Sequence, residues 1–321
     1  MMRSLFSGVS GLKSHQTRMD VIGNNIANVN TVGYKATRMV FQDLFSQTMA
    51  SASGATDNVG GTNARQIGLG VSGGAIDMLF TRSAQQTTGR PMDFMINGDG
   101  FFVVHDQNAL GSVVNYDPDN PPADGLDGGV MYTRAGNLYL DVDNNLVTAD
   151  GFKVMGWMHT NYDADGLGDY SDKALLPLEE DMQTSELQYI QIKCADSDGE
   201  PTDLFNDFAI DDKGMISATR RDDGTKVYFG YIALARFQNQ EGLEKVGNNM
   251  YRSSNNSGYA EYAPPGRSGF STIKAGTLEM SNVDLADAFT DMIITQRGFQ
   301  ANSRTITTTD SMLEELVNLK R

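Results

Sequence analysis

The apolar residues of the C-terminal stretch recur at alternating steps of three and four positions. Between Val283 and Leu319 the chain holds no proline and a single glycine, Gly298, which predicts one helix about 55 Å long at ~1.5 Å per residue. Such spacing is typical of a coiled-coil seam. A helix with so polar a far face is marginal alone and needs a partner, in the same chain or in other copies. The predicted seam consists of Leu285, Phe289, Met292, Phe299, Ile306, Leu313 and Val317.

An apolar residue also recurs at every seventh position near the N-terminus, and no proline interrupts residues 4–29. This repeat predicts a second helix that pairs with the first. Residues 1–42 carry five Lys or Arg and one Asp, whereas residues 275–321 carry four basic and seven acidic residues. The two ends are therefore electrostatically matched, at +4 and −3. The alternative is two ordinary surface helices that flank a domain. The N-terminal seam consists of Leu5, Leu12, Met19 and Ile26.

Small residues form a stripe along the predicted N-terminal helix. Its glycines, Gly8, Gly11 and Gly23, each cost about 1 kcal/mol relative to alanine in a helix. The segment therefore depends on tertiary or intermolecular support. A second helix can approach closely along the stripe, which comprises Ser4, Ser7, Gly8, Gly11 and Ser14.

The middle of the chain is rich in turn residues and predicts a β body. Apolar runs on both sides of Asn97-Gly98-Asp99-Gly100 predict one hairpin, and the segment from Tyr132 to Thr148 predicts a second. The stretch from Thr48 to Gly74 lacks periodicity and reads as a linker or a long loop that orders on contact. The fold class is therefore α+β, with two long terminal helices that pair as a coiled coil around a β-rich body of nested domains.

These patterns divide the chain into four regions. A terminal helical core comprises 1–30 and 283–321, and a connector comprises 31–80 and 272–282. The β-rich domain covers 81–159 and 205–271. Residues 160–204 form an acidic insertion or a small outer subdomain, because residues 141–212 hold eighteen Asp or Glu against three Lys.

The charge of the body argues against some partners. The net charge of the chain is −16, and residues 43–274 have a net charge of −17. Nucleic acid is therefore not expected as a partner, because phosphate binding needs a basic surface. No run approaches the roughly 20 apolar residues of a membrane span, and the N-terminus lacks a secretory signal pattern. The single cysteine, Cys194, excludes an internal disulfide.

Candidate chemical sites are weak. Gly68-Leu69-Gly70-Val71-Ser72-Gly73 fits the dinucleotide pattern but lacks the required strand before it and helix after it. The acidic groups Asp163-Asp165-Gly168-Asp169 and Asp141-Asp143-Asn145 resemble calcium loops without the final Glu. His15, His105 and His159 are isolated in the sequence. We therefore expect no catalytic, cofactor or metal site, and no enzyme.

Four separated motifs resemble the bacterial flagellar rod and hook family. They are the segments 27–35, 96–102, 132–137 and 281–302, and they occur in order. The resemblance covers roughly 1–158 and 205–321. The motif positions carried over from the family are Asn28, Thr31, Gly33, Tyr34, Lys35, Asn97, Gly98, Gly100, Phe101, Gln296 and Arg297.

The resemblance implies a structural subunit that stacks helically with copies of itself into a hollow tube in the bacterial flagellum, outside the cell. It also implies export through the flagellar secretion apparatus without a cleaved signal. The lack of a long apolar run predicts no membrane insertion. The terminal seams would then form the assembly interface. Further implied partners are the distal rod, the hook cap, the hook–filament junction proteins and the export apparatus.

Within this family, the sequence favours the hook, a curved tube that acts as a universal joint for motor torque. The segment 296–302 looks hook-like, and 321 residues with an insertion exceed a typical rod subunit. The alternative within the family is the distal rod, a straight drive shaft. An alternative from another class is an enzyme or a metal-binding module that stays a compact monomer.

Overall fold

A computed structural model of the chain describes residues 2–55, 60–105, 129–142, 144–158, 187–192, 205–220, 226–267 and 269–319. The chain divides into two compact units. The helical unit comprises Met1–Val29, Lys35–Leu79 and Val283–Arg321, and the β unit comprises Asn30–Tyr34 and Phe80–Asn282. Of the acidic segment 160–204, only residues 187–192 lie within the described residues.

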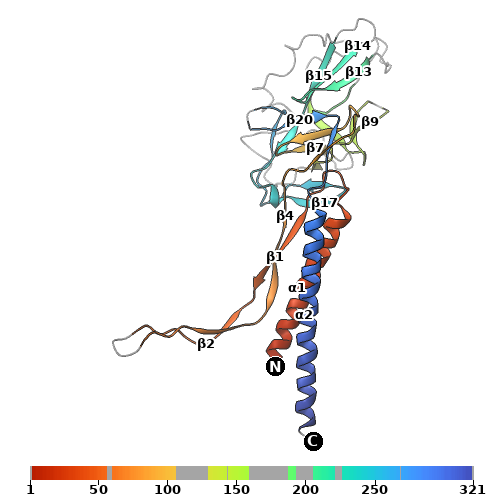
Figure 1. The fold of residues 1–321 in the computed structure, drawn as a ribbon. Helices are drawn as coiled ribbons and strands as arrows, with labels where there is room; N and C mark the ends of the chain where they lie inside the picture. Colours follow the sequence, from red (N-terminus) through yellow and green to blue (C-terminus); the bar gives the residue numbers. More distant parts are fainter. Residues whose placement is uncertain are drawn as a thin grey trace. The chain divides into compact units, whose positions relative to one another are not determined.

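Two long helices run side by side in the helical unit (Figure 1). They are α1 (Met2–Ala27) and α2 (Leu285–Asn318). Asp284 caps the N-terminus of α2, because its side chain accepts hydrogen bonds from the backbone N–H groups of Ala286 and Asp287. The predicted α+β class, with terminal helices flanking a β-rich body, is confirmed.

A two-part β ribbon continues from the helices within the same unit. Strand β1 (Thr37–Asp43) pairs antiparallel with β4 (Val71–Met78), and a register shift interrupts the pairing between Val40 and Phe41. Further along, β2 (Ser46–Ala50) pairs with β3 (Arg65–Gly68). The expectation of a loop from Thr48 to Gly74 was therefore wrong. Both faces of β2 and β3 are exposed, so these strands lack the apolar alternation by which a sequence reveals a strand.

The β unit is built around one large sheet with smaller pairs attached. The main path runs β13, β14, β15, β11, β7, β8, β18 and β17, with β9, β10, β12, β16 and β19 joined to it. The strands are β5 (Gln85–Thr87), β6 (Phe94–Asn97), β7 (Phe101–His105), β8 (Val130–Thr133), β9 (Leu138–Leu140), β10 (Leu146–Thr148), β11 (Lys153–Met158), β12 (Gln188–Tyr189), β13 (Phe205–Ile210), β14 (Met215–Arg220), β15 (Lys226–Ile232), β16 (Leu234–Arg236), β17 (Glu244–Gly247), β18 (Met250–Arg252), β19 (Glu261–Ala263), β20 (Thr272–Ala275) and β21 (Thr277–Glu279), with a 3-10 turn η3 (Gln240–Gly242).

The two predicted hairpins had different outcomes. Strands β9 and β10 pair as expected, with Leu146 opposite Leu140. The first hairpin was wrong, although both of its strands form. Strand β6 pairs with β20, whereas β7 pairs with β8, β11 and β16 in the main sheet. The neighbouring strand β21 pairs with β5. Gly98 and Gly100, both at φ 138, turn the chain from one sheet into the other, so tertiary pairing replaced local pairing.

The core of the β unit lies between these strands. Phe102, Val104 and Leu234 are fully buried on the central strands, and Trp157 on β11 is 2% exposed. Burying side chains of this size contributes about 1.5–3 kcal/mol each. No helix in the described residues is long and apolar enough to cross a membrane.

Candidate assembly interface

Small residues of α1 face α2 and set a close approach between the helices. A Cβ added to Gly8 would lie 3.0 Å from Thr305 Oγ1, and one added to Gly11 would lie 2.7 Å from Asn302 Nδ2. A Cβ added to Gly298 of α2 would lie 2.6 Å from His15 Cε1. The contacting residue numbers rise along α1 as they fall along α2, so the two helices are antiparallel. The close approach expected along the small-residue stripe is found at Gly8 and Gly11.

The face that α2 buries is rotated from the predicted seam. Thr295 and Thr309 are its buried residues, and they lie seven positions either side of Asn302, which faces Gly11. The predicted seam instead used the adjacent row that contains Phe289 and Val317. Polar and small residues therefore fill one row of the helix pair.

The predicted interface residues fall into two groups. Half-buried side chains are Leu5, Leu12, Met19, Ile26, Met292, Ile306 and Leu313. Exposed side chains are Leu285 (41%), Phe289 (51%), Phe299 (36%) and Val317 (66%). Ile293 and Ile294, which the sequence analysis did not select, are also exposed, at 57% and 56%. The helical unit by itself thus leaves much of the apolar surface of α2 in water.

A cluster around His15 joins α1, α2 and β1. The His15 ring lies edge-on to Phe41, with centroids 5.3 Å apart, and its buried Nδ1 has no hydrogen-bond partner among the described residues. Arg18 stacks over the same Phe41 ring and forms an ion pair of 3.3 Å with Asp291. Burial lowers the pKa of His15, and the positive charge of Arg18 lowers it further. The cluster therefore favours neutral histidine.

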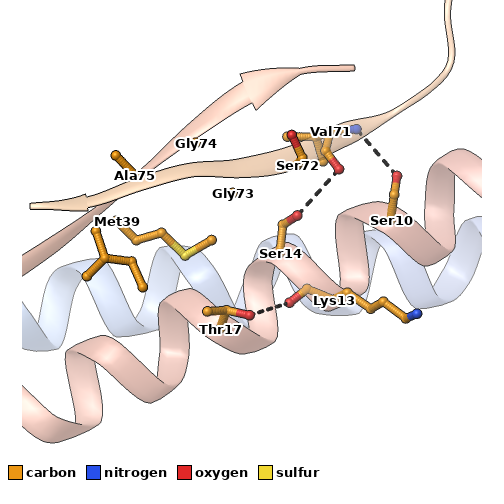
Figure 2. A pocket seen from close by; sticks show the side chains of 11 residues that line it. Ser10, Lys13, Ser14, Thr17, Met39, Val71, Ser72, Gly73, Gly74 and Ala75 are labelled. Carbon is orange, nitrogen blue, oxygen red and sulfur yellow. Dashed lines mark hydrogen bonds between the residues drawn. The ribbon is translucent and has the colours of Figure 1, made fainter. Parts of the chain in front are cut away.

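A groove of about 480 Å³ lies between α1 and β4 (Figure 2). Three of its hydroxyl groups bond within the chain: Ser10 accepts from Val71 N at 3.3 Å, and Ser14 and Thr17 donate to Val71 O and Lys13 O. The groove is lined by Ser10, Lys13, Ser14, Thr17, Met39, Val71, Ser72, Gly73, Gly74, Ala75 and Ile76. Because these three hydroxyls are paired and two glycines have no side chain, the groove offers apolar surface, the Ser72 hydroxyl and the ammonium group of Lys13.

The motif residues of the β unit surround a buried ion pair that sequence reasoning missed. Arg134 Nη1 lies 3.2 Å from Glu279 Oε2, and the side chains are 2% and 1% exposed. Gly33, at φ 69, donates its N–H to Glu279 O at 2.8 Å. The Arg134 guanidinium also lies 5.2 Å from the Phe101 ring centroid. A residue with a side chain at position 33 would meet the backbone of Arg134 and Ala135, which explains why glycine stands there.

Two aromatic residues complete this cluster. Burial raises the pKa of the Tyr251 hydroxyl. Its buried oxygen has no hydrogen-bond partner in the part of the chain that the structure describes. Tyr34 is 3% exposed, and Lys245 Nζ lies 4.1 Å from its ring centroid. Burial lowers the pKa of Lys245. These groups pack rather than form an open reactive cleft.

The remaining motif residues differ in their surroundings. Asn28 donates to Asn24 O at the end of α1, and Thr31 precedes the turn at Gly33. Lys35 is 1% exposed and Gly100 is buried, whereas Asn97 is exposed. On α2, Gln296 and Arg297 are exposed.

The candidate metal residues do not form a site in the described residues. No group of three or more His, Cys, Asp or Glu gathers there in a way that could hold a metal ion. Asp141 Oδ1 accepts from Val142 N, and His105 Nδ1 bonds Tyr189 Oη at 3.0 Å. Asp143, His159, Cys194 and the loop from Asp163 to Asp169 lie outside the described residues.

Comparisons with known proteins place these features in one family. Three family models match: the flagella basal body rod protein over residues 5–35, the D1 domain of flagellar hook protein FlgE/F/G over 123–218, and the C-terminal region of flagellar basal body rod FlgEFG proteins over 274–319. The chain is 43% identical to the flagellar basal-body rod protein FlgG of Bacillus subtilis over 322 positions, covering all of both chains.

Two proteins of Borreliella burgdorferi are similar over their full length and all of this chain. The identity is 32% over 462 positions for the flagellar hook protein FlgE and 31% over 322 positions for the rod protein FlgG. Full-length matches above 30% identity agree with the terminal helices and the motif cluster described above. The chain therefore belongs to the flagellar rod and hook family, whose members are structural components of the flagellar axis.

Proposed function

We propose that the chain is a structural subunit that polymerises with copies of itself into the distal rod of the flagellum, a stiff tube that carries torque. Polymerisation is supported by the exposed apolar surface of α2, which includes Leu285, Phe289 and Ile293. These positions are four residues apart and so lie in one line along the helix. An apolar line of this kind on a soluble subunit is typical of an interaction surface.

We propose that the apolar line of α2 packs against a different surface of the neighbouring copy. α1 offers such a surface, because Met2 and Phe6 are exposed and lie four residues apart. Heterologous contacts of this type generate open helical polymers when the rotation does not close. A tube built in this way covers the surface that a single subunit leaves exposed.

Relative length supports the rod over the hook. Both rod relatives align over 322 positions with full coverage of both chains, close to the 321 residues here. The hook protein of Borreliella needs 462 positions for the same coverage, so it holds long segments absent from this chain. The length argument that favoured the hook from sequence alone therefore points the other way once relatives are aligned.

The hook remains the second candidate. It is supported by a 32% identity to the hook protein that equals the 31% identity to the rod protein of the same organism. In both cases we infer export by the flagellar apparatus without a cleaved signal and end-to-end contact with neighbouring axial proteins. We propose no catalytic activity and no cofactor for the chain.

Electron microscopy of polymers formed by the purified full-length chain tests the proposal. Straight, rigid tubes support the rod, and curved, flexible tubes support the hook. A chain that stays monomeric at high concentration, with and without short rod fragments as seeds, contradicts assembly. A variant that lacks residues 283–321 is the control and should form no tubes.

A further inference from the structure

Among the described residues, the last turns of α2 extend beyond the end of α1. Gly11 lies beside Asn302 and Gly8 beside Thr305, and extending this antiparallel register places Met2 level with about Ser311. The segment from Met312 to Leu319 therefore runs past the first described residue of α1, as Figure 1 shows. We call this segment the α2 overhang. An isolated helix end of this length is marginal in water.

The α2 overhang carries an apolar row with a carboxylate inside it. Met312, Leu316 and Leu319 are 49%, 48% and 82% exposed, and their positions follow the i, i+4, i+7 spacing of a helix that lies in a groove. Glu315 stands at i+3 in the same row. It forms no ion pair with any residue in the described part of the chain. This row is therefore ready to bind an apolar surface with a cation beside it.

The groove between α1 and β4 offers an apolar surface with a cation beside it. The spacing of its residues on α1 matches that of the row on the α2 overhang. Along α1, Ser10, Lys13, Ser14 and Thr17 repeat the same i, i+3, i+4, i+7 spacing, with small residues where the α2 overhang has large ones. Lys13 is exposed and likewise lacks an ion-pair partner among the residues that the structure describes. Phe6 and Met2 are 62% and 61% exposed. They extend the apolar surface one and two turns from the groove toward the N-terminus of α1.

The α2 overhang cannot reach the groove of its own chain. In the helix pair, Lys13 is level with about position 300, so Glu315 lies some fifteen residues further along α2. At ~1.5 Å per residue this is about 22 Å along the helix axis. A rigid helix cannot fold back over that distance, so the occupant is a second copy.

We propose that the α2 overhang of one copy docks in the α1–β4 groove of another, with Glu315 paired to Lys13. The inference rests on the proposed polymerisation and names the surfaces that join. Glu315 on the α2 overhang and Lys13 in the groove carry opposite charges, and neither has an ion-pair partner among the described residues, which favours this pairing. The contact is heterologous, as an open polymer requires.

Charge reversal tests the pair. Lys13→Glu and Glu315→Lys should each raise the critical concentration for polymerisation about fivefold or more, because each places like charges together. The double variant, Lys13→Glu with Glu315→Lys, should restore it to near the original value. Glu314→Lys is the matched control, since its side chain leaves the helix about 100° away from that of Glu315, and it should have little effect.

Cysteine cross-linking gives an independent measurement. In a Cys194→Ser background, a mixture of Lys13→Cys and Glu315→Cys chains should form a disulfide-linked dimer on assembly, whereas Lys13→Cys with Glu314→Cys should not. Tubes that form normally with neither the charge effect nor the cross-link overturn this contact and leave the proposed function standing. Failure of the unmodified chain to form any tubes contradicts the proposed function, and this contact with it.

Discussion

Arg134 and Glu279 lie 145 residues apart in the sequence and form an ion pair of 3.2 Å inside the β unit. Removing one partner leaves an uncompensated buried charge, which costs about 3–5 kcal/mol. We expect Glu279→Ala to lower the free energy of unfolding by that amount, measured in urea by the fluorescence of the single tryptophan, buried Trp157. The double variant Arg134→Met with Glu279→Leu should be clearly more stable than Glu279→Ala. Equal stability of the two variants would show that the charge is not the cause.

The boundaries of the β unit give a second prediction. A fragment of residues 80–282 keeps β21, which pairs with β5, and keeps the partner of Arg134. A fragment of residues 45–275 ends after β20 and loses both β21 and Glu279, the ion-pair partner of Arg134. We expect cooperative unfolding with a buried Trp157 for the first fragment and a much weaker or absent transition for the second. Equal stability of the fragments would contradict the structural role of Glu279.

Two glycines of α1 provide a matched pair for the helix contact. A side chain at Gly11 meets Asn302, whereas a Cβ at Gly23 has no atom of the described residues within 4 Å. Gly11→Leu should destabilise the helix pair by about 1–3 kcal/mol through overpacking, and Gly23→Ala should stabilise it by about 0.5–1 kcal/mol through helix propensity. Thermal unfolding followed by circular dichroism checks both. Opposite signs are expected, and a loss of stability in Gly23→Ala would count against the open surroundings of that residue.

The apolar line of α2 should be needed for assembly but not for folding. Phe289→Asp would place an unpaired charge in a contact between copies, at a cost of several kcal/mol. We expect this variant to fold with an unchanged circular dichroism spectrum and to form no tubes. Thr307→Asp, on an exposed polar turn of the same helix, should assemble normally. Tube formation by Phe289→Asp would remove this line from the interface.

His15 predicts a loss of stability in mild acid. Its pKa is lowered in the folded chain, so below the ordinary histidine value of about 6.5 the unfolded chain binds more protons. The contribution of neutral His15 to the free energy of unfolding is therefore complete above that pH and declines as the pH falls toward and through the lowered pKa. Arg18 adds repulsion to the charged ring, and Asp291 already pairs with Arg18. His15→Gln should unfold with a weaker dependence between pH 7.5 and 5.5, measured by urea titration at each pH; an unchanged slope would exclude His15 as the titrating group.

Periodicity predicted the features that depend on neighbouring positions. The two terminal helices, the close approach at Gly8 and Gly11, and the β9–β10 pair all follow from residues within a turn or a hairpin of one another. The family was also evident from motifs, because those residues hold special backbone conformations, such as Gly33 at φ 69.

The tertiary structure decided what depends on distant contacts. Asn302 turns toward Gly11 because only a glycine admits so close a helix, and this rotates the seam away from Phe289. Strand β6 pairs with β20, far along the chain, rather than with its neighbour β7. Arg134 finds Glu279 for the same reason: burial selects partners by position in space, whereas periodicity records only spacing along the chain.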